Sequence, residues 1–160
     1  MPNEHKTQLS SDAAGGSDIA TAPRCVGDLM TTIVVQILPY KPFRDAVDLL
    51  AQHPFRHLLV AEADGRIVGV ISDRDVRSAA GCYDSDTTLA MDIMTPEPTT
   101  VHADTPISSA IALVRDLNFS SLPVVDADNR VVGIVTTDDL LVAFQNLQQR
   151  IEKLPAPSAF

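Results

Sequence analysis

Two stretches of this chain place a hydroxyl side chain three residues before a carboxylate, each directly after an apolar run. Ser72 precedes Asp75, and Thr136 precedes Asp139. A carboxylate has two acceptor oxygens, which suits a ligand with paired hydroxyls such as those of ribose. A helix N-terminus beside it would add spare N–H donors. The same spacing is also a common helix-capping pattern, so spacing alone leaves a ligand site and a simple cap both open.

Polar residues also precede a second apolar run in each half of the chain. Arg56 and His57 occupy these positions in the first half, and Ser120 and Ser121 occupy them in the second. An arginine can make a forked, charge-assisted contact to a phosphate, and a protonated histidine would add charge. The alternative for both basic residues is an ordinary solvated position on the surface.

The elements that must position these residues follow the same order twice. In the first half the pattern predicts a short helix within 23–30, a strand over 33–38, a helix over 43–53, strands over 58–61 and 67–71, and a helix over 73–80. In the second half it predicts a strand over 99–102, a helix starting at 106, strands over 122–125 and 131–135, and a longer helix over 137–153.

The repeated order reflects an internal duplication. Residues 30–75 align with residues 94–139 without a gap, and 14 of the 46 paired positions are identical. Each copy reads β-α-β-β-α, which predicts an α/β (α+β) fold. A unit that small cannot bury both faces of its sheet alone, so the two should pack together. We expect tails at 1–21 and 154–160, a first repeat at 22–82, and a second at 83–153 that ends in the extended helix.

Gly69 and Gly133 lie at matching positions inside predicted strands. A glycine within a strand often marks the close approach of another backbone or of a ligand. Tight packing against a neighbouring element is the equal alternative.

Composition excludes several classes of function. The net charge is −9 and no run of Lys or Arg interrupts it, which argues against a nucleic-acid partner. No apolar run approaches the roughly 20 residues that span a bilayer, and the polar first 21 residues lack a secretory signal. Cys25 and Cys82 form no C-x-x-C pattern. This cysteine usage fits a reducing compartment, so we expect the protein to be cytoplasmic. His53 and His102 form no metal-ligand cluster with Cys or acidic residues, and no catalytic motif is present.

The duplicated unit resembles the CBS domain, named for cystathionine β-synthase. The features that carry the resemblance are the β-α-β-β-α order, an Asp-h-Met-Thr segment at 28–31 and 92–95 (h is apolar), and a Gly-h-h-Ser/Thr-x-x-Asp ending at 69–75 and 133–139. The pair looks like a Bateman module, with its two small sheets in a pseudo-two-fold arrangement, and it is expected to be a stand-alone CBS-domain protein.

The resemblance implies a regulatory sensor rather than an enzyme. Such modules bind an adenosine-containing ligand (AMP, ADP, ATP, S-adenosylmethionine or NAD) in clefts between the repeats and use no catalytic cofactor. The alternative is a structural or interaction module whose clefts are degenerate and which acts through dimerisation or through a partner enzyme.

The family pattern also implies roles for individual residues. It assigns the ribose to Asp75 and Asp139, with Ser72 and Thr136 near ribose or phosphate. The phosphates would be reached from the positions of Arg56 and His57 in the first repeat and of Ser120 and Ser121 in the second. Arg74 is a further candidate, because its charge flanks the Asp75 cleft. The adenine would lie against Thr99 in the Asp75 cleft and against Val35 in the Asp139 cleft, with Phe55 and Phe119 nearby; for these two phenylalanines a core position is the alternative.

The two clefts should not be equivalent, because Asp139 has the acidic neighbour Asp138 where Asp75 has Arg74. Repulsion should weaken a phosphate beside Asp139. The expected partners are the adenosyl ligand, a second copy of the chain and an unidentified regulated protein, without nucleic acid or membrane. A homodimer is expected because helical faces carry apolar residues: Val76, Ala79, Ala80, Leu140, Leu141, Ala143 and Phe144.

Overall fold

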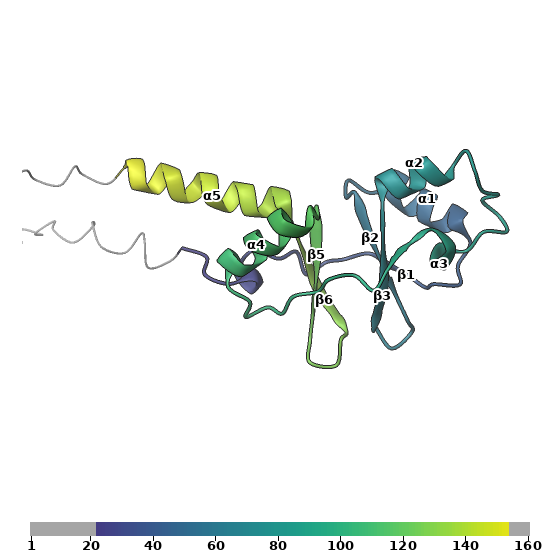
Figure 1. Ribbon diagram of the computed structural model, residues 1–160, viewed down its shortest axis with the longest axis horizontal. Helices are drawn as coiled ribbons and strands as arrows, with labels where there is room; N and C mark the ends of the chain where they lie inside the picture. Colours follow the sequence, from purple (N-terminus) through teal and green to yellow (C-terminus); the bar gives the residue numbers. More distant parts are fainter. Residues whose placement is uncertain (1–21, 154–160) are drawn as a thin grey trace, which may run out of the picture.

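The structure is a computed structural model that describes residues 22–153 (Figure 1). The tails predicted at 1–21 and 154–160 lie outside the described residues. The first half contains a 3₁₀ turn η1 (Val26–Asp28), β1 (Gln36–Ile37), α1 (Phe43–Gln52), β2 (His57–Ala61), β3 (Ile67–Ser72) and α2 (Asp73–Ala79). The second half contains α3 (Ala90–Ile93), β4 (Thr95–Pro96), α4 (Ile107–Leu117), β5 (Ser121–Val125), β6 (Val131–Thr136) and α5 (Thr137–Glu152).

Two small sheets lie side by side, and helices cover their outer sides (Figure 1). One sheet has the order β1-β2-β3-β4, and the other pairs β5 with β6. The predicted α/β repeat is therefore confirmed. A third apolar cluster, built on Leu59, Ile67 and Val125, fills the space between the two halves. The hairpin turns of both halves also meet, since Ile67 N donates to Asn129 O and Val131 N donates to Gly65 O.

The predicted first strand of each repeat is largely wrong. Only Gln36–Ile37 forms a strand within 33–38, and within 99–102 only Val101 forms an isolated bridge, to Val124. The reason is that each segment crosses from one sheet to the other. Thr31 is hydrogen-bonded to Ile134 in the second sheet, whereas Val35 already accepts from Leu59 N in the first. Little of the crossing chain can therefore stay in register with either sheet.

The leading segment of each half packs on the opposite half. Met30 joins the apolar cluster around Leu122 and Val135, whereas Met94 joins the cluster around Leu58 and Ile71. The strand β4 likewise adds to β3, with Thr95 opposite Val70. In Figure 1 the purple turn η1 accordingly lies beside α4, and α3 lies beside α1 and α2. Each core is thus completed by residues from the other half of the sequence.

The two strand glycines make this exchange sterically possible. A Cβ on Gly133 would lie 2.9 Å from Met30 Sδ and 2.9 Å from the backbone oxygen of Thr31. A Cβ on Gly69 would collide with the side chain of Met94. The sequence left open whether these glycines face a ligand or another backbone, or pack tightly against a neighbouring element. The structure shows close packing against the methionine-bearing segment of the other half.

We expect Gly133→Ala to destabilise the fold by about 1–3 kcal/mol, the usual cost of forcing extra atoms into a packed site. The carbonyl of Thr31 belongs to the backbone and cannot rotate away from the new methyl group. Urea unfolding monitored by circular dichroism would measure the change. Gly81→Ala is the matched control, because its Cβ would meet no atom within 4 Å. Equal stability of the two variants would contradict this account of the glycine.

Candidate functional site

The two hydroxyl–acid pairs are both capping boxes, at the first turns of α2 and α5. Asp75 N donates to Ser72 Oγ at 3.2 Å, and Asp75 Oδ2 accepts from Ser72 N and from Ser72 Oγ, both at 2.7 Å. Thr136 and Asp139 repeat the geometry at 3.2, 2.8 and 2.7 Å. The cap accounts for one carboxylate oxygen of each acid. No group within residues 22–153 donates to the other oxygen, which leaves it available as an acceptor.

Strand pairing brings the other predicted polar residues beside these caps. His57 is opposite Ser72 in the β2–β3 pair, and Ser121 is opposite Thr136 in the β5–β6 pair. The first N–H of each helix is satisfied by a backbone oxygen: Asp73 N donates to Arg56 O, and Thr137 N donates to Ser120 O, each at 3.0 Å.

One donor remains in the first turn of each helix. Among residues 22–153, no loop carbonyl and no side chain accepts from the backbone N–H groups of Arg74 and Asp138, and the second N–H of a helix has no partner within the helix. Such groups at a helix start can bind an anionic or hydroxyl oxygen.

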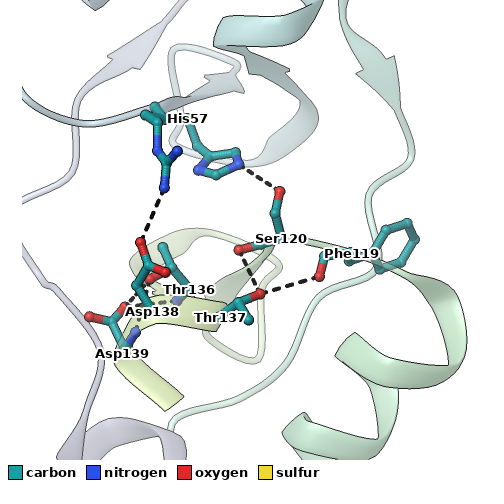
Figure 2. A network of polar contacts seen from close by, with 8 residues as sticks. His57, Phe119, Ser120, Thr136, Thr137, Asp138 and Asp139 are labelled. Carbon is teal, nitrogen blue, oxygen red and sulfur yellow. Dashed lines mark hydrogen bonds and ion pairs between the residues drawn. The ribbon is translucent and has the colours of Figure 1, made fainter. Parts of the chain in front are cut away.

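Side chains from the two halves meet at this end of the interface (Figure 2). His57 Nε2 lies 2.9 Å from Ser120 Oγ, and Arg56 Nη2 lies 3.2 Å from Asp138 Oδ2. We call the set Arg56, His57, Ser120 and Asp138 the polar cluster. Arg56 is therefore directed toward the second repeat, although its position in the sequence assigns it to the Asp75 side. Thr137 Oγ1 closes the base of the cluster by donating toward the carbonyl oxygens of Phe119 and Ser120.

Burial lowers the pKa of His57, and the positive charge of Arg56 lowers it further. The carboxylates of Asp75 and Asp138 act in the opposite direction but do not cancel these effects. His57 is therefore neutral at pH 7. Its contact with Ser120 is an ordinary neutral hydrogen bond, and Arg56 supplies the positive charge of the polar cluster.

The remaining predicted site residues differ in how far they are exposed to solvent. Arg74 is exposed and forms no ion pair with any of residues 22–153. Thr99 and Val35 are half-buried on the crossing segments. Val35 packs against the first core, as does Phe55, which also stacks on His53 with ring centroids 4.9 Å apart. Phe119 is 38% exposed. Phe55 therefore has the core-packing role that was its alternative, whereas Phe119 is open to solvent.

A groove of about 530 Å³ begins at Asp139 and follows α5. Its other wall is the leading segment of the first half, including Pro23, Asp28 and Leu29. Val35 is not among the residues that line it. Sequence reasoning missed this wall, although the repeated Asp-h-Met-Thr segment was a signal that residues near 28 belong beside the second repeat. A second groove, of about 350 Å³, lies by the hairpin turns and is lined partly by Glu97 and Asn129.

Two further observations concern the described residues alone. No three His, Cys, Asp or Glu side chains within 22–153 gather in a way that could hold a metal ion. Among the helices of the same region, none has the length and apolar character that a membrane crossing requires.

Comparison with known proteins identifies the repeat. The CBS domain family matches at residues 26–81 and again at 90–146. Among curated proteins, a homoserine O-acetyltransferase of Methanocorpusculum labreanum is 33% identical over 119 residues, which are 74% of this chain but 24% of that protein. The CBS domain-containing protein CBSX2 of Arabidopsis thaliana is 29% identical over 157 residues, covering 79% of this chain and 66% of CBSX2. The chain thus spans about a quarter of the first of these relatives and two thirds of the second.

Solved structures agree with the sequence match. CBSX2 in complex with AMP superposes with a TM-score of 0.70 at 29% identity, covering 79% of this chain and 99% of CBSX2. The CBS domain pair of MJ0100, in complex with 5′-methylthioadenosine and S-adenosyl-L-methionine, has a TM-score of 0.69 at 29% identity and covers 75% and 98% of the two chains. The cytosolic domain of the Mg²⁺ channel MgtE, in complex with ATP, has a TM-score of 0.66 at 31% identity over 74% and 48%. Two matched repeats, packed as a pair with exchanged leading segments, place this chain in the CBS domain family.

Proposed function

We propose that this CBS pair is a regulatory module that binds an adenosine-containing ligand between its two repeats. The observation that carries the proposal is the convergence of two capped acids, Asp75 and Asp139, with the polar cluster at one end of the repeat interface. Each acid retains a free acceptor oxygen for a sugar hydroxyl, and the neighbouring helix turn retains a free N–H. The ligands named for the related structures are AMP, ATP, 5′-methylthioadenosine and S-adenosyl-L-methionine, which all contain adenosine.

The enzyme names among the relatives do not transfer to this chain. The matched acetyltransferase and the L-aspartate semialdehyde sulfurtransferase of Methanocaldococcus jannaschii share only 24% and 18% of their lengths with it. A magnesium transporter of Enterococcus faecalis shares a similar fraction, 25%. Proteins with such different activities have the CBS pair in common, which supports a regulatory rather than a catalytic role for the shared part.

The proposal extends to self-association, because α5 presents apolar side chains to solvent. Leu141 is 60% exposed, and Val142 and Phe144 are each 55% exposed. An apolar face of this kind is costly to leave in water and is commonly covered in a two-fold dimer. A second copy of the chain is the partner we propose for it. Dimerisation through this face is also how the module would act on a partner enzyme if its ligand sites were degenerate.

We expect AMP to raise the melting temperature of the protein, since a ligand that binds only the folded state stabilises it.

Asp75→Asn should weaken AMP binding about tenfold and Asp139→Asn should weaken it less, because Arg74 neighbours the first acid and Asp138 the second. The amide keeps the capping acceptor, so folding should be preserved. Calorimetric titration of each variant measures the difference, with Asp116→Asn as an exposed control. Loss of AMP binding in Asp139→Asn alone would reverse the assignment.

We expect acid to destabilise the folded protein through His57. The folded-state pKa of this histidine lies below its unfolded value, chiefly because of burial. Below about pH 6.5 the unfolded chain therefore binds more protons, and the folded state loses stability as the pH falls. Urea unfolding between pH 7.5 and 5 should show a smaller loss in His57→Gln than in the wild type. His53→Gln, at an exposed histidine, is the control. Parallel pH profiles for the wild type and His57→Gln would refute this.

We expect a dimer at micromolar concentration, held partly by α5. Phe144→Glu places a charge on the exposed apolar face and should shift the population toward monomer, as measured by light scattering. Gln145→Glu adds the same charge at the adjacent exposed position and should leave the dimer intact. A monomeric mass for the wild type would contradict the expectation.

A further inference from the structure

Within residues 22–153, one ion pair bridges the two repeats at the proposed ligand site. It joins Arg56, which directly precedes β2, to Asp138, the second residue of α5. The two side chains are separated by 82 positions in the sequence and remain 71% and 73% exposed. The pair is therefore accessible to a ligand, and a competing anion could take the place of the Asp138 carboxylate on Arg56 without opening a core.

The pair has no counterpart across the pseudo-two-fold axis. The residues that match Arg56 and Asp138 in the other repeat are Ser120 and Arg74, which cannot form an ion pair. Ser120 is instead taken up by the contact with His57. At this end of the described structure the duplication has thus produced a single ion pair, Arg56–Asp138, which we call the latch. Its acidic residue, Asp138, directly precedes Asp139.

The charges around this latch oppose a phosphate. His57 is neutral at pH 7 because burial lowers its pKa. Arg56 then carries the positive charge of the polar cluster, and its Nη2 already donates a hydrogen bond to Asp138 Oδ2. A phosphate that binds Arg56 must first displace the carboxylate of Asp138. It then remains close to two negative charges, those of Asp138 and Asp139. An uncharged adenosine group meets neither cost.

We propose that Asp138 sets the charge preference of the ligand site, by holding Arg56 and thereby lowering the affinity for phosphate-bearing adenosine ligands relative to adenosine itself. This inference rests on the proposed function, since it concerns the same site. It makes Asp138 a specificity-determining residue, and it assigns to Arg56 a phosphate contact that is available only after the latch opens.

The test is a calorimetric titration of AMP and of adenosine into the wild type and Asp138→Asn. The amide removes the charge but keeps the size of the side chain. AMP affinity should rise about three- to fivefold, the span expected when an exposed ion pair no longer competes for the arginine. Adenosine affinity should stay within about twofold. Asp116→Asn makes the same charge change at an exposed residue that pairs with its neighbour Arg115, and it should alter neither affinity.

A double variant separates the latch from a general charge effect. Adding Arg56→Ala to Asp138→Asn should abolish the gain in AMP affinity, because the gain requires the freed guanidinium. Two results would overturn the role of Asp138: equal changes in AMP and adenosine affinity in Asp138→Asn, or a gain in AMP affinity that survives the loss of Arg56. In either case, adenosine binding by the wild type would still uphold the proposed function. Absence of binding by both ligands in both proteins would overturn the proposed function, and the role of Asp138 with it.

Discussion

The close approach of a methionine-bearing segment to a strand glycine is the constraint on which the rest of this structure depends. Met30 and Thr31 fit against Gly133, and Met94 fits against Gly69. These contacts attach the leading segment of each half to the sheet of the other half. Neither half could then bury its core alone, because part of that core comes from the other. The duplication is in this sense a single folding unit rather than two domains joined by a linker.

This exchange also creates the geometry of the proposed site. Since the leading segments cross between the sheets, the two halves are held face to face, with their hairpin turns in contact at one end. The opposite ends of β2 and β5 then bring Arg56 and His57 against Ser120 and Asp138. The helix starts that carry Asp75 and Asp139 belong to the same end, because each follows directly from β3 or β6. The proposed site depends on both repeats, so a ligand bound there would contact both halves at once.

The capped acids show how one group can serve structure and ligand together. Asp75 and Asp139 each use one oxygen for the capping box, which stabilises a helix start by about 0.5–2 kcal/mol. The second oxygen accepts no hydrogen bond from any group within residues 22–153. A cap orients the carboxylate before any ligand arrives, and such preorganisation lowers the entropy cost of binding. The alternatives of cap and ligand contact that the spacing left open are therefore compatible in this fold.

The sequence by itself determined the duplication, the order of the longer helices and of the two hairpins, and the two capping boxes. These features depend on local spacing and on turn residues such as Asp64-Gly65, and local interactions decide them. Tertiary structure alone decided three things: the exchange of leading segments, the loss of most of the strand predicted at 33–38 and of all of the strand predicted at 99–102, and the direction of Arg56. Each depends on contacts between residues far apart in the chain. A repeat alignment places Arg56 with its own repeat, whereas the packing of two sheets brings it to Asp138. The physical reason is that periodicity reports which face of an element is buried but carries no information about which other element covers that face.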